Sequence, residues 1–536
     1  MKLTFLLLPT FLFFLFSCKP SGQVVDPAPA PSPTGDGTSS ITISGNITYD
    51  SVPILDTGLN YAGIVKKPLR KIYLELVNAN TNQIISNTST DDSGNYSFTY
   101  SNAITKIYVR IRAEIKSPSV VIEDNTNGNA VYVVESADYL VSQNTTLPII
   151  NLASGWSSIS NSYASARVSG PFAILDSVLS AIDKVSAAKP SLVFPALKIN
   201  WSVNNTNESG DESLGKIGTS HYSPSSGELY ILGKANVDTD EFDTHVVVHE
   251  WGHYFEDKLG RSDSIGGQHG SGDEKDIALA FGEGWGNALS AMILDPLITY
   301  RDSMGQRQAT IGVRFSLELS TDSSPGWFSE ISVQEILFDL YDSSNSHPDN
   351  LSLGLSPLID VMTTHQVSTR AITSIFSFIN GLKSKYLSSA TAINTLTSSK
   401  LISNVIDDFG SGETNSAGWA PNLPVYRSLT YGASPLSAIV WGEGLIYNDI
   451  GNNRLFKFTA TKSSTAMTLT CEDTCIYDIM DGKNIIATDY EVYSGNPITL
   501  SKAFSTVSGR VYIIRVQTDG NYVTTPDLFN ISLEID

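Results

Sequence analysis

Basic residues are scarce in this chain. Its 536 residues include 34 Lys and Arg against 55 Asp and Glu, so the formal net charge at pH 7 is −21. A protein that binds nucleic acid needs a basic footprint to neutralise phosphates, so this charge argues against a nucleic-acid partner. It agrees with a soluble, well-hydrated surface. A chain of this length is expected to divide into about three or four domains.

Long apolar runs are also lacking, with one exception at the N-terminus. Residues 3–16 are predominantly apolar, but the run is too short to span a bilayer comfortably. It has the length of a signal peptide and ends in Leu15-Phe16-Ser17-Cys18. This end resembles the lipobox of bacterial lipoproteins, whose Cys is lipidated and becomes the mature N-terminus, although Phe16 replaces the usual small residue. The alternative is an ordinary cleaved signal peptide with an incidental Cys18.

The lipobox resemblance implies a protein tethered to a membrane. Residues 1–18 would be the lipoprotein signal peptide, and the lipid on Cys18 would be the membrane partner. Residues 19–40 form a Pro/Ser/Gly-rich stretch that suits a flexible tether. Lys19 stands where an Asp would favour retention in the inner membrane. The expected location is therefore the bacterial cell envelope, at the outer membrane or cell surface, with secretion as the alternative.

Cysteine is rare, with three in the whole chain. Once Cys18 is assigned to the lipid, Cys471 and Cys475 remain, in the sequence Cys-Glu-Asp-Thr-Cys. An exported protein meets oxidising conditions, so a local disulfide between these two is expected. A metal site there is disfavoured because no His or third Cys lies nearby.

Residues 41–150 have the pattern of β-structure. Apolar residues alternate with others over residues 72–77 and 107–112, the period of a half-buried strand. Between them, residues 90–98 combine an acidic, Gly-containing turn with alternating aromatics, which indicates a hairpin. The region resembles the regulatory-like β-sandwich found in carboxypeptidases and many exported bacterial proteins. We expect it to serve as a spacer.

Residues 429–536 are also expected to be β-structure. The sequences Asn448-Asp449, Phe456-Lys457-Phe458 and the segment 509–513 resemble the pre-peptidase C-terminal type of β-sandwich, which follows many secreted bacterial peptidases. Between the two β-regions, residues 151–428 contain several segments whose apolar residues recur at the spacing of one helix face, and we call each such segment a helical stripe. These stripes are centred on residues 170–185, 240–259, 273–295, 328–342 and 369–387, and Thr239 or Asp240 is the expected cap of the second.

The second helical stripe carries the motif His249-Glu250-Trp251-Gly252-His253, the HExxH pattern. Residues four apart lie on one face of a helix, so both imidazoles can reach one zinc ion. Glu250 is then placed beside the water on the metal and can take its proton. This geometry predicts His249 and His253 as ligands of a catalytic Zn²⁺ and Glu250 as the general base.

The third ligand is expected from the next helical stripe. Glu283 lies there in the sequence Phe-Gly-Glu-Gly-Trp-Gly-Asn, and a second packed helix would bring it to the metal. Two His and one Glu leave a fourth position for water, as a catalytic zinc requires. Gly282, Gly284 and Gly286 are unfavourable inside a helix, each by about 1 kcal/mol relative to Ala. Their presence around Glu283 indicates a close approach of two helices.

These motifs resemble the gluzincin peptidases, and the GEGW sequence is closest to the fungalysin group. The resemblance implies one catalytic zinc held by His249, His253 and Glu283, with Glu250 as the base, within a peptidase domain at residues 151–428. It also implies the fold class: a multidomain chain with an α+β zincin-like catalytic domain flanked by two β-sandwich domains.

One position departs from the family pattern. Asn287 stands where the family has an Asp that orients a ligand histidine, and an amide polarises an imidazole less than a carboxylate does. Two functions therefore stay open. The first is a surface-anchored or secreted zinc endopeptidase that acts on protein or peptide substrates, which the intact Glu250 favours. The alternative is a catalytically inactive zincin-scaffold adhesin or binding lipoprotein, which Asn287 favours; the ligand set disfavours a purely structural zinc.

Several other residues are candidates for lesser roles. His245 is expected beside the site or at the surface, and His269 lies in a Gly-rich loop that is expected to line the cleft. Residues 227–232 form either the edge strand on which a peptide pairs or an ordinary strand. The sequence indicates no oligomeric state. The residue that stabilises the oxyanion is one of four candidates: His221, Tyr222, Tyr254 and His347.

Overall fold

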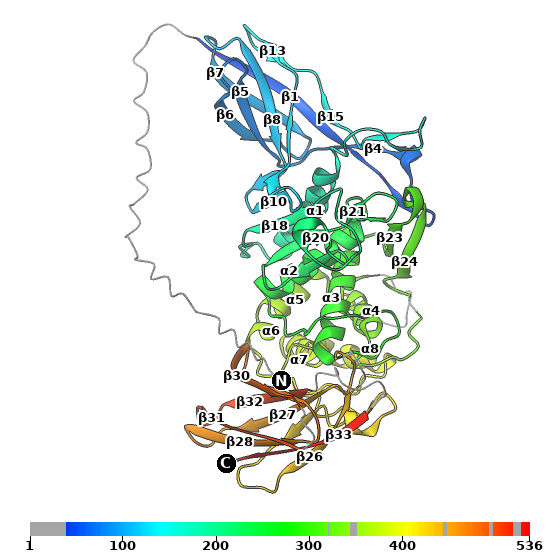
Figure 1. The fold of residues 1–536 in the computed structure, drawn as a ribbon, viewed down its shortest axis with the longest axis vertical. Helices are drawn as coiled ribbons and strands as arrows, with labels where there is room; N and C mark the ends of the chain where they lie inside the picture. Colours follow the sequence, from blue (N-terminus) through cyan, green and yellow to red (C-terminus); the bar gives the residue numbers. More distant parts are fainter. Residues whose placement is uncertain (1–38, 320, 344–350, 443–446, 493–496, 518–526) are drawn as a thin grey trace, which may run out of the picture.

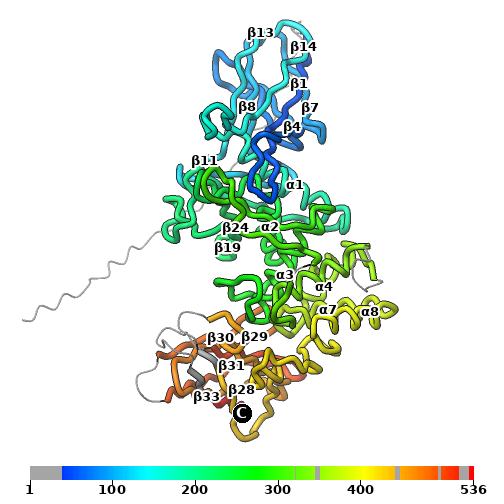
Figure 2. Tube along the Cα trace, turned by 90° about the vertical axis from the view of Figure 1, so that its right-hand side faces the viewer, coloured from blue at the N-terminus to red at the C-terminus, as the bar shows by residue number. Residues whose placement is uncertain are grey.

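The computed structural model describes residues 39–319, 321–343, 351–442, 447–492, 497–517 and 527–536. The predicted signal peptide with Cys18, most of the predicted tether and His347 lie outside these residues. Three regions follow one another along the long axis of the molecule, and two views at right angles show the same order (Figures 1 and 2). They are a β-rich N-terminal region, a helix-rich middle region and a β-rich C-terminal region.

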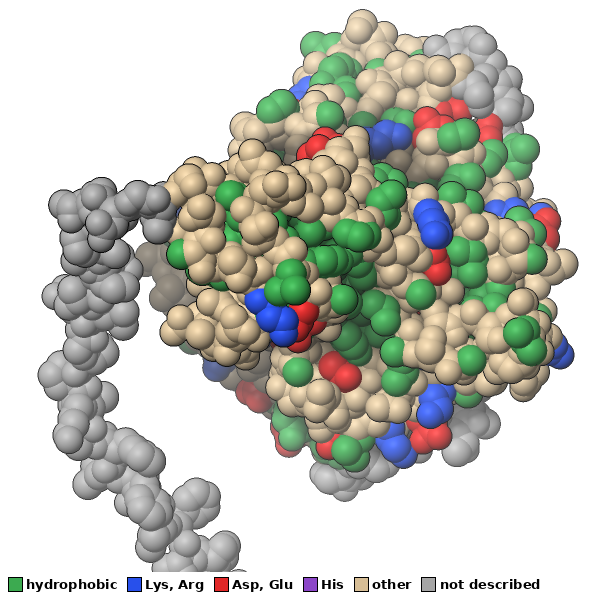
Figure 3. Space-filling model, turned by 90° about the horizontal axis from the view of Figure 1, so that it is seen from above, with side chains coloured by type: hydrophobic (Ala, Val, Ile, Leu, Met, Phe, Trp, Pro, Cys, Tyr) green, Lys and Arg blue, Asp and Glu red, His purple; other side chains and the backbone are tan. Residues whose placement is uncertain are grey.

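The N-terminal region is built around strand β1 (Ser40–Ser51), whose alternate residues are buried. Two five-stranded sheets make up most of this region. Seen from above, the molecule shows mainly uncharged polar and apolar side chains with scattered Lys, Arg, Asp and Glu (Figure 3). The first sheet contains β1 with β4 (Val65–Pro68), β7 (Asn95–Ser101), β14 (Thr145–Thr146) and β15 (Ile150–Leu152). The second contains β5 (Tyr73–Asn78), β6 (Gln83–Ser89), β8 (Lys106–Arg112), β12 (Val133–Glu135) and β13 (Tyr139–Leu140).

A six-stranded sheet joins the N-terminal and middle regions. Its order is β11-β10-β18-β20-β19, with β9 paired to β10. Strand β19 forms one end of this order, so β19 is the edge and β20, predicted as a candidate edge strand, lies inside the sheet. The strands are β9 (Glu114–Lys116), β10 (Ser119–Asp124), β11 (Ala130–Val131), β18 (Leu197–Trp201), β19 (His221–Ser223) and β20 (Glu228–Ile231).

The predicted fold class is wrong. The sequence predicts an α+β zincin-like catalytic domain between two β-sandwich domains, whereas the described residues are 24% helix and 35% strand, spread over several sheets, with no clear α+β zincin domain among them. The physical reason is long-range pairing. Strand β10 pairs in parallel with β18, and one buried core extends from Ile41 to Ile513 through all three regions. Local periodicity detects single helices but not such pairings.

The middle region contains the helices, which pack around α2 and α3. Helix α2 starts at Thr244 after Asp243 rather than after the expected caps Thr239 or Asp240, and Gly260 ends it. Helix α3 is long and apolar enough to cross a membrane, but 94% of it is buried inside the protein, as in a core helix. The helices are α1 (Gly170–Ala188), α2 (Thr244–Leu259), α3 (Ile277–Leu294), α4 (Glu330–Tyr341), α5 (Leu355–Thr363), α6 (His365–Ser368), α7 (Ile375–Lys385) and α8 (Ala390–Ser399).

A small four-stranded sheet lies beside the N-terminal end of α2. Its order is β21-β22-β23-β24, and β22 pairs with β23 where Asp238 faces Met304. Asp243, the residue before α2, accepts hydrogen bonds from the backbone N–H and the hydroxyl of Ser303. The start of α2 is thereby attached to this sheet. The strands are β21 (Gly233–Lys234), β22 (Asp238–Thr239), β23 (Thr299–Met304) and β24 (Thr310–Ser316).

The C-terminal region consists of two antiparallel-rich sheets with a shared core of their own. Cys471, the last residue of β28, forms a disulfide with Cys475, the first residue of β29, which confirms the predicted bond. The bond closes the connection between the two sheets. One sheet contains β25 (Tyr426–Ser428), β27 (Asn453–Thr459), β29 (Cys475–Asp481), β30 (Asn484–Glu491) and β32 (Val511–Gln517). The other contains β26 (Leu436–Gly442), β28 (Ser464–Cys471), β31 (Ile498–Ser505) and β33 (Asp527–Ile535).

Candidate metal site

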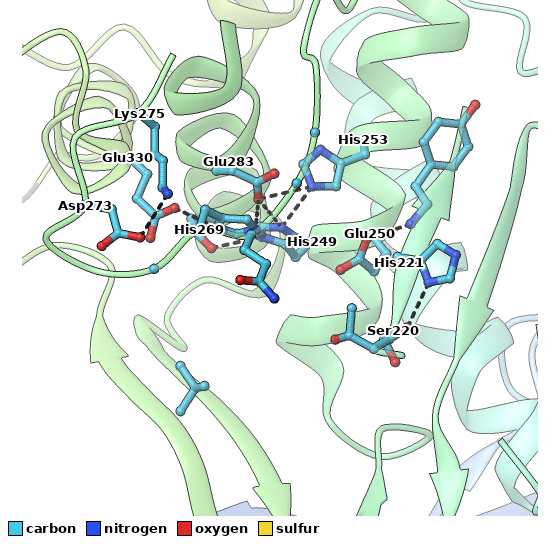
Figure 4. Close-up of a pocket in the computed structure, with 18 of the residues that line it drawn as sticks. Ser220, His221, His249, Glu250, His253, His269, Asp273, Lys275, Glu283 and Glu330 are labelled. Carbon is cyan, nitrogen blue, oxygen red and sulfur yellow. Dashed lines mark hydrogen bonds and ion pairs between the residues drawn. The ribbon is translucent and has the colours of Figure 1, made fainter. Parts of the chain in front are cut away.

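Two helices bring three metal-ligating side chains together. His249 and His253 lie one turn apart on α2 and Glu283 lies on α3, and Figure 4 shows the three side chains pointing at one another. The Nε2 atoms of the two histidines are 3.0 Å apart. Glu283 Oε2 lies 3.2 Å from His249 Nε2 and 3.4 Å from His253 Nε2. The three side chains therefore present their ligand atoms to one point.

These separations fit a zinc ion. Ligands placed tetrahedrally at about 2.0–2.1 Å from zinc lie about 3.3–3.4 Å from one another. His249 Nδ1 lies 2.9 Å from the Asn287 Oδ1, which can only accept, so the histidine proton is on Nδ1 and Nε2 presents a lone pair. Two His and one Glu supply three ligands and leave the fourth position for water. The donor set is thus that of a catalytic rather than a structural zinc.

Glycines permit the helices to approach so closely. A Cβ on Gly286 would lie 2.9 Å from the ring of His249, and one on Gly252 would lie 3.1 Å from the Cα of Gly286. On the other side of α3, a Cβ on Gly284 would lie 2.9 Å from the carbonyl oxygen of Glu330 on α4. The close helix–helix approach expected from the glycines around Glu283 is present, and it places Glu283 between α2 and α4.

Burial and histidine neighbours set the charge on Glu283. Burial acts to raise the pKa of this carboxyl, but His253, His249 and His269 outweigh it and hold the pKa well below its usual range. Glu283 is therefore ionised at neutral pH, as a metal ligand must be.

Glu250 lies beside the ligands on α2. Its side chain is buried, and the backbone N–H of Tyr222 on β19 donates to its Oε2 over 2.9 Å. Burial raises the pKa of Glu250 to about 7, although the neighbouring His249 acts to lower it. A carboxyl group with a pKa near neutrality is suited both to take a proton and to return it. The position and chemistry are those expected of a general base.

His269 reaches the site from the Gly-rich loop, where it meets a carboxylate that no sequence motif indicates. Its Nε2 lies 3.3 Å from Glu283 Oε2, and its Nδ1 lies 2.9 Å from Glu330 Oε2 at the start of α4. Burial opposes a charge on His269, but Glu283 and Glu330 outweigh burial and raise its pKa to about 9. Glu330 is itself buried. The pair adds a positive group and a second carboxylate to the edge of the site.

An open cavity of about 1810 Å³ borders these residues. Besides the site residues themselves, its walls include residues 219–222 around β19, the Gly-rich loop 266–272, residues 312–315 on β24, and residues 447–450 from the C-terminal region. Pockets for single small ligands are usually about 300–1,000 Å³. The space is larger than the usual pocket for a single small ligand.

The other residues predicted as candidates for a role at the site lie in different surroundings. His221 and Tyr222 line the cavity, but Tyr254 is buried and donates its hydroxyl hydrogen to the Pro195 carbonyl oxygen outside it. His245 is also buried; its Nδ1 lies 3.0 Å from the Ser290 hydroxyl, and burial lowers its pKa to about 3. Sequence reasoning missed Tyr300 on β23, whose ring lines the cavity with its centre 6.2 Å from that of His249.

The C-terminal region holds the Gly-rich loop in place. The side-chain amide of Asn448 donates to the carbonyl oxygens of Gly266 and Gln268 over 3.0 and 2.9 Å. Lys275, just after the loop, forms an ion pair of 2.7 Å with Asp449. His269 therefore depends for its position on residues far away in the sequence.

Asn287 offers a direct test of how His249 is oriented. An Asn287→Leu variant loses the acceptor for His249 Nδ1, so we expect zinc affinity and any zinc-dependent activity to fall about 10- to 100-fold. Asn287→Asp keeps the acceptor and adds charge, so its zinc affinity should equal or exceed that of the wild type. Competition with a chromophoric chelator measures both values.

Ser290→Ala is the matched control for this test. Ser290 lies three residues after Asn287 on α3. Its hydroxyl contacts His245, which is not one of the three proposed zinc ligands. Its removal should leave zinc affinity unchanged. Wild-type affinity in Asn287→Leu would show that Asn287 does not orient the ligand.

Comparisons with known proteins give little further information. No family model matches the chain, and no curated protein matches it. Among solved structures, the pre-peptidase C-terminal domain of a collagenase from Bacillus anthracis is similar over 21% of this chain and 94% of its own, with 9% identity and a TM-score of 0.15. A 9R-lipoxygenase from Cyanothece matches 30% of this chain and 27% of its own at 13% identity and a TM-score of 0.15. A periplasmic inhibitor of g-type lysozyme from Aeromonas hydrophila matches 21% of this chain and 96% of its own at 12% identity and a TM-score of 0.14.

At such low TM-scores these similarities carry no argument about function. The predicted resemblance to a pre-peptidase C-terminal domain has a weak counterpart among them. The resemblance to gluzincin peptidases remains a prediction that rests on the motif residues themselves.

Proposed function

We propose that this chain is a zinc-dependent peptidase that hydrolyses peptide bonds in protein or peptide substrates. The observation that supports it most is the convergence of His249, His253 and Glu283 at separations that fit tetrahedral zinc. The buried carboxyl of Glu250 beside them supplies a base. The HExxH and GEGW motifs resemble those of gluzincin peptidases and support the same function. These side chains support the proposed function independently of the fold class.

The chain's own residues account for most of the chemistry. When bound, zinc would supply a Lewis acid that polarises the substrate carbonyl and makes a water acidic enough to react near neutral pH. Glu250 takes the proton from that water and delivers it to the leaving amine. Asn287 holds the His249 ring in place. A substrate in extended form can lie along the edge strand β19, which borders the cavity beside Glu250 and whose Tyr222 N–H is already bonded to Glu250.

The zinc requirement is the first part to test. We expect the purified protein to carry about one zinc per chain and to cleave casein. A chelator such as 1,10-phenanthroline should abolish cleavage, and added zinc should restore it. His253→Ala should lose both zinc and activity, because the remaining two ligands bind zinc far more weakly. Atomic absorption and a fluorescent casein assay measure the two quantities.

His365→Ala is the control. His365 also faces a carboxylate, Asp408, at 2.8 Å, but it does not line the cavity, so zinc content and cleavage should be unchanged. A wild-type protein without zinc would refute the ligand assignment. A protein that holds zinc but cleaves neither casein nor a peptide library would instead be the binding lipoprotein that Asn287 favours.

A further inference from the structure

A second group of acidic side chains lies in the wall of the same cavity. Asp238 on β22, Asp240 just after β22, and Asp302 on β23 each offer a carboxylate oxygen, and these atoms lie within 4.8 Å of one another. None of the three belongs to the proposed zinc site. They connect the small four-stranded sheet to the segment that leads into α2.

These carboxylates are buried without a positive partner. Asp238 is 6% exposed and Asp240 is 2% exposed, and one oxygen of each of the three aspartates has no hydrogen-bond partner. Among the described residues, no Lys, Arg or His forms an ion pair with any of them. An unpartnered oxygen on a side chain that is almost completely buried, yet borders a cavity, indicates that a ligand belongs there.

Two arginines of the neighbouring segments are engaged elsewhere. Arg301 precedes Asp302 on β23, so its side chain projects from the opposite face of the strand, where it pairs with Asp56 at 2.7 Å. Arg167 pairs with Glu241 at 2.6 Å. Neither neutralises the three aspartates. Burial and the charge of Asp302 raise the pKa of Asp238 to about 7, which shows how unfavourable the charged group is on its own.

We propose that Asp238, Asp240 and Asp302 bind a divalent cation, and that this cation is Ca²⁺. Three carboxylates without nitrogen or sulfur ligands select a hard cation. Ca²⁺ accepts about 6–8 oxygens at about 2.3–2.6 Å in flexible geometry, which agrees with carboxylate oxygens at these separations and with water from the cavity. Mg²⁺ demands stricter octahedral geometry at shorter distances.

The bound cation would act as a structural clamp. It would join β22, β23 and the segment before α2, and Asp243 already ties the same segment to Ser303 of β23. Tyr300 on β23 packs near His249, so the clamp also fixes one wall of the zinc site. This role does not depend on peptidase activity.

Calcium binding is measured on the full chain after EDTA treatment and reloading with one equivalent of zinc. Calorimetric titration with CaCl₂ should show about one site per chain, and millimolar Ca²⁺ should raise Tm by about 3 °C or more. Asp240→Asn should lose the site and the rise. Without calcium, however, Asp240→Asn should melt above the wild type, because the substitution removes a buried charge that only the cation neutralises.

Two further comparisons make the outcome decisive. Asp302→Asn should behave like Asp240→Asn. Asp56→Asn should keep the calcium response, because Asp56 is exposed and pairs with Arg301 outside the cation site. The proposal is overturned if the wild type shows no calcium response or if Asp240→Asn and Asp302→Asn retain it. An equal response to Mg²⁺ at the same concentration would overturn the assignment to Ca²⁺. Because neither readout uses catalysis, failure here is separate from failure of the proposed peptidase function.

Discussion

Replacing Glu250 with Gln is expected to lower kcat/KM for casein about 10²- to 10⁴-fold, the usual contribution of a positioned acid–base group. The change removes the proton acceptor but keeps the size of the side chain. The amide oxygen can still accept the hydrogen bond from the Tyr222 backbone N–H, so the fold around α2 should be preserved. About one zinc per chain should remain, because Glu250 is not a ligand. Steady-state kinetics and metal analysis on one preparation measure both effects.

Glu256→Gln is the matched control for this experiment. Glu256 lies on the same helix and is also buried, and burial raises its pKa well above the usual range, but the side chain does not line the cavity. Its replacement should change kcat/KM by no more than a few fold. Equal losses in Glu250→Gln and Glu256→Gln would mean that burial on α2, rather than base catalysis, explains the effect. Full activity in Glu250→Gln would refute Glu250 as the base.

Removing residues 429–536 is expected to unfold the middle region as well. Ile450, Leu455, Met480 and Ile513 belong to the same buried core as the helices around the metal site. The buried guanidinium of Arg261 also donates to the Gly482 carbonyl oxygen over 3.0 Å, and truncation would leave that donor without its partner. Losing four buried apolar side chains at about 2–5 kcal/mol each would cost about 8–20 kcal/mol, which is as large as the usual stability of a whole domain, about 5–15 kcal/mol. Circular dichroism and limited proteolysis of the truncated chain test this expectation; a cooperative melt near that of the full chain would contradict it.

A milder variant separates the local effect from global unfolding. Asn448→Ala keeps the whole chain but removes two hydrogen bonds to the Gly-rich loop, each worth about 1 kcal/mol. We expect the fold to persist while cleavage falls by up to about 30-fold, since about 1.4 kcal/mol corresponds to a factor of ten and the two bonds together are worth about 2 kcal/mol. Asn530→Ala, which removes an exposed amide contact to Glu472, is the control and should leave cleavage unchanged.

The sequence predicts those parts of the site that depend on local geometry. The spacing of His249 and His253 on one helix, and the glycines around Glu283, follow from helical periodicity and side-chain size, and the structure brings these residues together. Glu330, Tyr300 and Asn448 could not be found in this way. Each comes from another segment, and no local pattern indicates which cavity a distant strand or loop will border.

The prediction of the fold class was wrong for a related reason. Alternation over residues 72–77 and 107–112 correctly places strands β5 and β8. The pairing of β10 with β18, however, joins segments on either side of residue 150, and the core continues into the C-terminal region. Periodicity describes which face of an element is buried but not its partner. The lipid anchor on Cys18 remains a prediction.

Helix α3 has a consequence for the order in which the protein assembles. Gly282, Gly284 and Gly286 together lower its intrinsic helical stability by about 3 kcal/mol relative to Ala, so α3 is a poor helix in the newly made chain. We expect its packing against α2 and α4 to supply most of its stability. Because the ligands come from two helices, we expect a high-affinity zinc site only in molecules in which α2 and α3 have docked. Zinc uptake at this site would then report that the central helices have docked, whatever the chain does with the metal.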